Sequence, residues 1–407
     1  MSAQGLGPFM EIPSFITVGS EFFRGASMVV DIVCWGFLRK FIWLNLGVFV
    51  VLGCGMACEV AQSGASQNTS PVIVSQSLKK GDDGPAGLSP IQLVTRYTWI
   101  SGDYKGLWKS VDAGKNWIKV FPVDDDGSAT AVGTRCLSMI NEKDGYAVFE
   151  NSVVRTYDGG DSWEIQTQLE SQFSTLGCYF SDINHGWLVG WYFNDEYFEH
   201  PEYGKGFGGI LFTADGGVSW KAIDIRDVTD ERDERGESAC SEVTFLSEKV
   251  GFVVGDFGAI MTKDGGRSWK QVKITGGKQI AVSKIWAGSK RYLIVYSPHS
   301  KKAFFSRDGG IFWSPLSFSF EYGDLEPSFA FGLSNVIFAT LTDVYRSDNR
   351  GRSWNKIESS QLDTNGLTDL QVVTSLDGEI VVLGMDPVSH KSRAYFSSDN
   401  GKSWIEY

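Results

Sequence analysis

Carboxylates gathered in two stretches are the side chains of this sequence best suited to chemistry. Asp124, Asp125 and Asp126 form one acidic run, and a second dense run of charges lies between Asp224 and Ser238. Two carboxylates facing each other at roughly 5 to 9.5 Å could cleave a glycosidic bond. The alternative is that these charges only keep connecting loops in solution. The sequence leaves both interpretations open.

Metal and cofactor chemistry finds little support in the sequence. The histidines are scattered without the spacing of metal ligands, and no loop has the spacing of an EF-hand. We therefore expect no metal site and no cofactor. The four histidines are His185, His200, His299 and His390.

Three cysteines, Cys136, Cys178 and Cys240, fall near the starts of three successive strand-like segments. In an oxidising compartment two of them could pair and leave one odd. The favoured interpretation is that all three are small buried hydrophobic residues.

An aromatic insertion at residues 191–203 is the best candidate binding surface. Tyrosine and tryptophan are favoured at interfaces because they combine a large apolar area with a polar tip. The alternative is that these side chains fold back onto the protein. We expect an exposed loop that contacts a partner through Trp191, Tyr192, Phe193, Tyr197, Phe198 and Tyr203.

An eight-residue phrase, Ser/Thr-x-Asp-x-Gly-x-x-Trp, occurs seven times and organises the chain. Its tryptophans lie 46, 57, 49, 44, 41 and 50 residues apart, a period typical of propellers and solenoids. Only the sixth copy departs, with asparagine in place of aspartate. The third positions are Asp112, Asp158, Asp215, Asp264, Asp308, Asn349 and Asp399, and the tryptophans are Trp117, Trp163, Trp220, Trp269, Trp313, Trp354 and Trp404.

Each phrase has the composition of a tight hairpin turn. Its aspartate can accept hydrogen bonds from backbone N–H groups one or two residues on, and the Ser or Thr hydroxyl can join that network. Strand-like residues precede and follow the phrase, as at 153–156 and 220–223. We expect it to join the third strand of a blade to the fourth. The predicted fold is all-β, a seven-bladed propeller of four-stranded antiparallel blades over residues 91–407, closed by side-chain packing between blades one and seven.

This phrase resembles the Asp-box, or BNR repeat, of sialidase-like β-propellers. Within that group, the pattern from Gly251 to Trp269 is most similar to the photosystem II stability/assembly factor family and its bacterial relatives. The resemblance covers residues 91–407 and implies a non-catalytic scaffold that holds membrane-protein intermediates. The photosynthetic members carry an arginine-rich patch, and no corresponding cluster stands out in this sequence. A photosystem client is therefore not expected from the resemblance alone.

Sialidase activity is disfavoured by the same comparison. Those enzymes have six blades, an Arg-Ile-Pro motif and three arginines that grip a carboxylate. The motif does not occur here, and Arg96, Arg135 and Arg291 form no recognisable pattern. The rival function is a secreted glycan-binding protein or glycoside hydrolase. Its site would lie at the central channel of the propeller, on the face opposite the repeated turns.

The first 58 residues indicate export and membrane attachment. Arg39 and Lys40 precede an uncharged stretch of thirteen residues, the layout of a signal peptide and short for a spanning helix. Val51-Leu52-Gly53-Cys54 resembles a lipobox, which implies lipidation of Cys54. An uncleaved anchor is the alternative, and Met28 is a second candidate start. Residues 59–90 form a flexible, polar linker.

The formal net charge of −12 and the pI near 4.9 argue against nucleic acid as a partner. The expected function is that of a non-catalytic, membrane-tethered scaffold outside the cytoplasm. It would bind a membrane-associated protein partner and assist a membrane complex, with a glycan as the alternative ligand.

Overall fold

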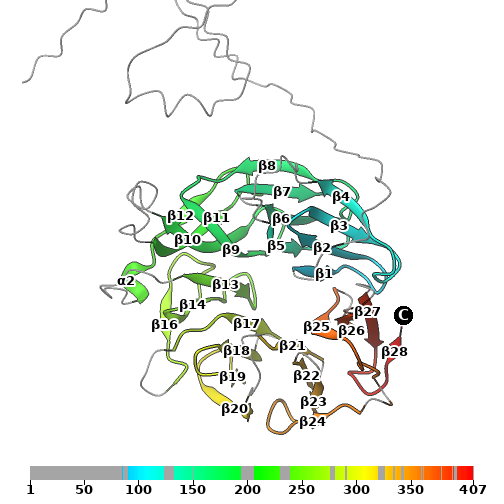
Figure 1. The fold of residues 1–407 in the computed structure, drawn as a ribbon. Coiled ribbons are helices and arrows are strands. Elements are labelled where there is room, and N and C mark those ends of the chain that lie inside the picture. The colour runs from blue at the N-terminus through cyan, green and yellow to red at the C-terminus, as the bar shows by residue number, and fades with distance from the viewer. Residues whose placement is uncertain are drawn as a thin grey trace, which may run out of the picture. The chain divides into compact units, whose positions relative to one another are not determined.

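Short apolar strands joined by glycine-rich turns form seven four-stranded antiparallel sheets in the part of the chain that the structure describes. The strands of each sheet are consecutive in sequence, so each sheet is one propeller blade. Figure 1 shows the blades in a ring, with the first strand of each blade nearest the centre. The expected seven-bladed all-β propeller is confirmed. This computed structural model describes residues 85, 90–122, 133–149, 151–193, 206–229, 239–275, 280–288, 291–319, 326–332, 335–340, 343–358, 360, 362–376, 378–386, 388 and 392–406.

Blades one to four contain most of the longer strands. They consist of β1 (Ile91–Leu93), β2 (Trp99–Asp103), β3 (Gly106–Ser110) and β4 (Ile118–Pro122); β5 (Thr134–Met139), β6 (Gly145–Phe149), β7 (Ser152–Thr156) and β8 (Glu164–Gln168); β9 (Phe173–Phe180), β10 (Gly186–Phe193), β11 (Gly206–Thr213) and β12 (Lys221–Ile223); and β13 (Cys240–Phe245), β14 (Gly251–Gly255), β15 (Gly258–Thr262) and β16 (Lys270–Val272). A short helix, α2 (Arg226–Thr229), follows blade three.

Blades five to seven repeat the same order. They consist of β17 (Lys284–Ala287), β18 (Leu293–Ser297), β19 (Lys302–Ser306) and β20 (Trp313–Ser319); β21 (Ser328–Phe331), β22 (Val336–Ala339), β23 (Val344–Ser347) and β24 (Asn355–Lys356); and β25 (Thr368–Thr374), β26 (Ile380–Met385), β27 (Ser392–Ser397) and β28 (Ile405–Glu406).

Seven hydrophobic clusters of the described residues lie between neighbouring blades, one at each interface. The tryptophan of each repeated phrase packs into the cluster between its own blade and the preceding one. Trp163, for example, packs with Ile100 and Leu107 of blade one. A single blade would leave these faces exposed to water, so stability comes from stacking neighbours.

The innermost strands are also joined by side-chain hydrogen bonds to the next blade. Gln92 of blade one accepts the backbone N–H of Met139 at 3.0 Å, and Ser138 accepts that of Phe180 at 3.2 Å. Ser328 accepts the N–H of Val372 in blade seven at 3.0 Å and donates to its carbonyl at 2.8 Å. These bonds satisfy backbone groups on strands that have no further strand beside them.

Blade seven closes the ring against blade one without exchange of a strand among the described residues. Trp99 of β2 is fully buried, with its ring 6.0 Å from that of Phe396 in β27. Arg96 forms an ion pair with Glu379, and its Nε donates to Oε2 at 2.8 Å. Packing thus closes the ring, as expected from the sequence.

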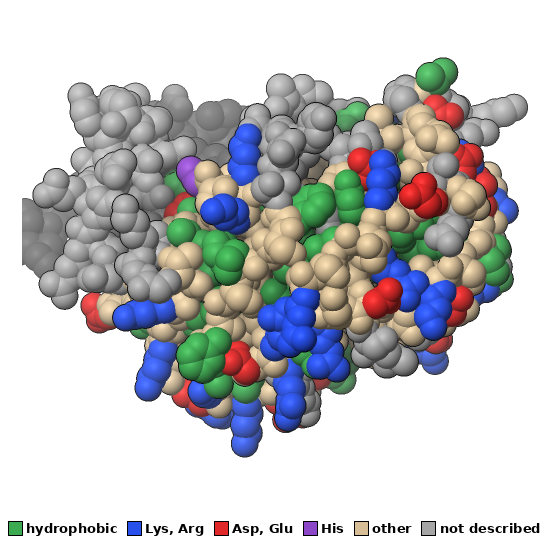
Figure 2. Space-filling model, turned by 90° about the horizontal axis from the view of Figure 1, so that it is seen from below, with side chains coloured by type: hydrophobic (Ala, Val, Ile, Leu, Met, Phe, Trp, Pro, Cys, Tyr) green, Lys and Arg blue, Asp and Glu red, His purple; other side chains and the backbone are tan. Residues whose placement is uncertain are grey.

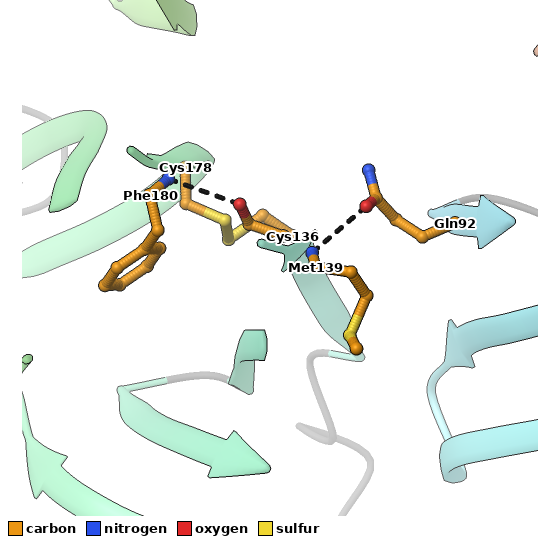
Figure 3. The surroundings of a disulfide bond; sticks show 6 residues. Gln92, Cys136, Met139, Cys178 and Phe180 are labelled. Carbon is orange, nitrogen blue, oxygen red and sulfur yellow. Dashed lines mark hydrogen bonds between the residues drawn. A yellow bond between two sulfur atoms is a disulfide. The ribbon is translucent and has the colours of Figure 1, made fainter. Parts of the chain in front are cut away.

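A disulfide joins Cys136 of β5 to Cys178 of β9, with Cα atoms 5.8 Å apart (Figure 3). It links blades two and three beside the Ser138–Phe180 hydrogen bond. The favoured interpretation of these two residues as unpaired hydrophobic side chains was therefore wrong. Neighbouring inner strands bring their side chains within bonding distance, which the spacing in sequence does not reveal. Cys240 is buried and is not part of this bond.

Each eight-residue phrase, called here a repeat turn, connects the third strand of its blade to the fourth. In repeat turn four, Thr262 donates its hydroxyl to Asp264 at 2.8 Å and accepts the N–H of Gly266. Asp264 accepts the N–H of Ser268, four residues on, at 2.9 Å. The expectation of bonds to residues one or two positions on was wrong. Two left-handed glycines curl the chain so that later N–H groups reach the carboxylate.

Acid destabilises the propeller through these aspartates. Hydrogen bonds from Ser219 and its backbone hold the pKa of Asp215 at about 2, and those from Ser268 hold the pKa of Asp264 at about 2. The stabilisation that comes from a lowered aspartate pKa is fully present above the pKa of the unfolded chain, about 4. It is lost as the pH falls through the pKa of the folded protein, about 2. We expect the melting temperature to fall between about pH 4 and pH 2. Calorimetry across this range measures it.

The matched control is Asp264→Asn, because Asn349 already fills this position in repeat turn six. The variant keeps an acceptor but loses one titrating group, so its melting temperature should fall less across that pH range. An identical acid profile would exclude Asp264 as a source of the pH dependence.

Candidate binding surface

The two faces of the propeller carry different connections between strands. Because strands alternate in direction, the turns between first and second strands share a face with the repeat turns. We call this the repeat-turn face. The connections between second and third strands, and those between blades, lie on the opposite face. Of the insertion, residues 191–193 are described, and they lie toward that opposite face at the end of β10.

The aromatic insertion is in part a strand. Trp191, Tyr192 and Phe193 end β10 and pair with Gly208, Phe207 and Gly206 of β11. The expectation of an exposed loop at these three positions was wrong, because the hairpin continues further than the aromatic run suggests.

Tyr192 packs into the blade between Phe173, at 4.9 Å between rings, and Phe207, at 5.6 Å. Trp191 lies on the other side of the strand, its ring 6.2 Å from that of Phe193. Tyr197, Phe198 and Tyr203 lie outside the described residues, as do Asp124, Asp125 and Asp126 and most of the second charged run.

Three arginines meet on the repeat-turn face of blades five and six, and we call Arg307, Arg350 and Arg352 the arginine surface. Arg307 donates to the carbonyl of Arg350 at 2.9 Å, and its guanidinium lies 4.7 Å from the ring of Phe305. No carboxylate of the described residues forms an ion pair with any of the three. This group of three arginines was not identified from the sequence, and whether it corresponds to the family's arginine-rich patch stays untested.

The electrostatics of this surface are unfavourable in isolation. Burial, followed by the neighbouring Arg352 and Arg350 charges, lowers the pKa of Arg307. The Nε of Arg307 is buried and has no hydrogen-bond partner among the described residues. Like charges held together without a counter-charge are destabilising. A bound anion would supply the counter-charge and could also accept a hydrogen bond from the Nε of Arg307.

Arg350 also occupies an unusual backbone position. Its φ is 60°, in the left-handed region, where four other repeat turns have glycine. Non-glycine residues in this region carry strain that often marks functional sites. Its guanidinium stacks over Tyr292 at 4.7 Å.

A cavity of about 310 Å³ opens beside Arg350. Tyr292, Phe305 and Phe331 contribute aromatic walls, and Asn335 contributes an amide whose Oδ1 is buried without a partner in the described structure. Aromatic walls with a few polar groups are typical of a site for one side chain or chain end. The arginine surface and this cavity together can receive a carboxylate attached to an apolar group.

A larger cleft of about 1020 Å³ lies between blades three and four on the same face. The ring of His185 stacks on that of Phe212 at 6.2 Å, and His185 Nδ1 pairs with Asp182 at 2.9 Å. Lys221, Lys249 and Arg267 line the cleft together with Asp182, Asp224 and Glu248. The cleft has no dominant charge, so it suits a neutral polar ligand better than an anion.

Arg96, considered above for a sialidase site, pairs with Glu379 at the closure of the ring. Separately, Glu242 accepts the N–H of Ile285 at 2.8 Å between blades four and five. Burial raises the pKa of Glu242, and the adjacent Glu242 raises the pKa of Lys284. Among the described residues, no three His, Cys, Asp or Glu side chains could hold a metal ion.

No described helix is long and apolar enough to cross a membrane. Cys54 and the other residues of the expected signal or anchor lie outside the described ranges.

Comparison with known proteins identifies the fold. No family model matches the chain, and no curated protein matches it. An ancestral GH74 enzyme is similar with a TM-score of 0.59 and 13% identity, over 82% of this chain and 48% of that one. The extracellular domain assigned to a hybrid two-component system of B. thetaiotaomicron gives a TM-score of 0.52 and 11% identity, over 80% and 39%.

The YCF48 structure bound to a D1 peptide gives a TM-score of 0.47 and 20% identity, over 67% of this chain and 81% of that one. At identities of 11% and 13%, the two likenesses with TM-scores above 0.5 establish a propeller fold and nothing finer. The chain spans about half the length of the GH74 enzyme.

Proposed function

We propose that this protein is a non-catalytic, membrane-tethered scaffold outside the cytoplasm that binds a protein partner through the arginine surface. The observation that carries the proposal is the group Arg307, Arg350 and Arg352, which has no ion-pair partner among the described residues and lies beside an aromatic cavity. An acidic segment of a protein supplies carboxylates for the guanidinium groups and an apolar side chain for the cavity. Assembly or stability of a membrane complex is the role that the sequence resemblance implies.

Export is supported by the Cys136–Cys178 disulfide, since such bonds persist in oxidising compartments. The lipobox-like stretch ending at Cys54 then supplies the tether, and residues 59–90 the linker.

The other repeat turns supply conservative variants for the test. Arg307→Ser copies Ser398 of repeat turn seven, and Arg350→Asn copies Asn400, which has the same left-handed φ. Combined, they should reduce partner recovery at least about tenfold, as expected when about 1.4 kcal/mol or more of binding is lost. The measurement is a pull-down from the membrane fraction with the intact protein, followed by the affinity of the recovered partner.

The matched control is Arg267→Val, which copies Val218 and removes one arginine from the same face. It should leave recovery unchanged. A second arm replaces Tyr197, Phe198 and Tyr203 by serine and tests the aromatic insertion without altering β10. If only this arm loses the partner, the contact involves the insertion rather than the arginine surface. If no partner is specific to the wild type, the scaffold proposal is wrong.

The cleft between blades three and four favours a second candidate, a glycan-binding or glycan-cleaving role. Aromatic rings such as Phe212 pack against sugar rings, while Asp182 and His185 can bond their hydroxyl groups. Saturable binding of a neutral oligosaccharide that Phe212→Ala removes, with no protein partner recovered, would support this role instead.

A further inference from the structure

Repeat turn five breaks a rule that the other six keep. In those six, a serine or asparagine immediately precedes the tryptophan. Its side chain bonds the repeat aspartate or asparagine, as Ser268 does to Asp264 at 2.6 Å and Ser219 to Asp215 at 2.5 Å. Repeat turn five has Phe312 there, which can form no such bond. The requirements of the turn therefore do not explain Phe312.

Phe312 and the preceding Ile311 project into solvent, and we call this pair the apolar tip. Phe312 is 75% exposed and Ile311 is 59% exposed. Repeat turns one and seven have lysine in place of Ile311, and turns four and six have arginine. Phe312 and Ile311 still donate their backbone N–H groups to Asp308, so the turn itself is intact. Its side chains contribute exposed apolar area where the other turns are mostly polar.

Basic side chains flank the apolar tip on both sides. A groove of about 410 Å³ next to the tip is lined by Lys263, Lys270 and Lys273 together with Ile311, and by no acidic residue of the described chain. The arginine surface lies on the other side, where Ser317 of β20 bonds the carbonyl of Arg352 at 3.0 Å. Figure 2 shows the molecule from below the view of Figure 1, and Lys and Arg side chains lie there among hydrophobic and acidic ones.

The sequence shows the same asymmetry of charge. Residues 257–358 contain fifteen Lys and Arg and eight Asp and Glu, within a chain of net charge −12. The apolar tip thus lies within a stretch that has a basic excess, although the chain as a whole is acidic.

We propose that the apolar tip is a membrane-docking point, with Phe312 and Ile311 entering the interfacial region of a bilayer and the flanking lysines contacting anionic lipid headgroups. Apolar insertion and attraction to anionic lipids act together in interfacial binding. Each Lys or Arg near an anionic surface contributes about 1 kcal/mol, or about fivefold in affinity.

A lipid surface fits this geometry better than a protein partner does. The tip is a convex turn, and a bilayer accepts a convex insertion without a matching pocket. The cavity and the unpaired groups that suit an acidic protein segment lie on the opposite side of the tip, at Arg350. This inference goes beyond the proposed function, and either can fail alone.

The experiment measures flotation of residues 69–407 with vesicles. This compact unit contains every described core cluster, and its ring closes on itself. The vesicles are phosphatidylcholine alone, or equal parts of phosphatidylcholine and phosphatidylglycerol. We expect binding to the anionic vesicles only, weakened by added salt because headgroup attraction is screened.

Phe312→Ser introduces the residue that five other repeat turns have at this position, so it should preserve folding, and its melting temperature checks this. Ile311→Lys copies Lys115 and Lys402 and adds a positive charge. Insertion of the tip predicts that each variant loses about tenfold in vesicle binding, whereas attraction by charge alone predicts that Ile311→Lys binds more tightly. Val218→Lys, at the exposed equivalent of Ile311 in repeat turn three, is the control and should not lose binding.

Wild-type protein that stays unbound, or variants that bind as well as wild type, would overturn the proposal. If the wild type does not bind vesicles but Phe312→Ser loses the protein partner in the pull-down, the tip is a protein contact instead. The assay contains no protein partner, so its failure leaves the arginine-surface test unaffected.

Discussion

Removal of the Cys136–Cys178 disulfide is expected to lower the free energy of unfolding of the propeller by about 2 to 4 kcal/mol. The bond joins residues 42 positions apart on the inner strands of blades two and three. It restricts the unfolded chain, and removing it restores that freedom. Urea denaturation of the double variant Cys136→Ala, Cys178→Ala, compared with wild type under oxidising conditions, measures the loss.

A reducing agent supplies the control. Wild-type protein in dithiothreitol should approach the stability of the double variant, and the double variant should not respond to the reagent. A double variant as stable as oxidised wild type would show that packing and the Ser138–Phe180 hydrogen bond hold these blades without covalent help.

The propeller could be predicted from the sequence because each repeat turn combines the same physical requirements. A hydroxyl, an acceptor, a left-handed position and a large apolar ring recur in the same order, and only a hairpin between two strands satisfies all of them. The hydrogen-bond partners inside the turn could not be predicted. They depend on the curl produced by backbone angles such as the φ of 73° and 82° at Gly265 and Gly266.

The disulfide was missed because it depends on strand register. Cys136 and Cys178 lie at different positions along their strands, with Cys136 opposite Val148 and Cys178 opposite Leu188. A register shift lies beside each of them, between Thr134 and Cys136 and between Val189 and Gly190. Such irregularities move side chains by amounts that the spacing of the repeats does not encode.

The arginine surface was missed for a different reason. Arg307, Arg350 and Arg352 look isolated in the sequence, but they occupy the second, fourth and sixth positions of repeat turns five and six. Adjacent repeat turns share one face, so comparing these positions between neighbouring turns would have found the group. The same alignment reveals Phe312 as the exception before the tryptophan. Residues 191–193 were expected in a loop because their composition resembles an interface, whereas β10 extends to Phe193 and Tyr192 packs against the blade.

Replacement of Trp99 by alanine is expected to lower the free energy of unfolding by about 3 to 5 kcal/mol. Trp99 is fully buried between blades one and seven, 6.0 Å from the ring of Phe396 and 6.3 Å from that of Trp117. Its indole N–H donates to the carbonyl of Arg96 at 3.0 Å, and Arg96 pairs with Glu379 across the same interface. Because no strand crosses this interface, the cavity left by the substitution weakens both the packing and the support of the ion pair.

Hydrogen exchange distinguishes a closure residue from a general core residue. Amides of β1 and of β25–β28 should exchange faster in Trp99→Ala, while those of β13–β16 on the far side of the ring change less. Tyr97→Ala, in the same turn but 46% exposed, is the control and should change neither stability nor exchange by a comparable amount. Equal acceleration in every blade would mean that the ring opens only by complete unfolding, and that closure between blades one and seven is not the weakest contact of the propeller.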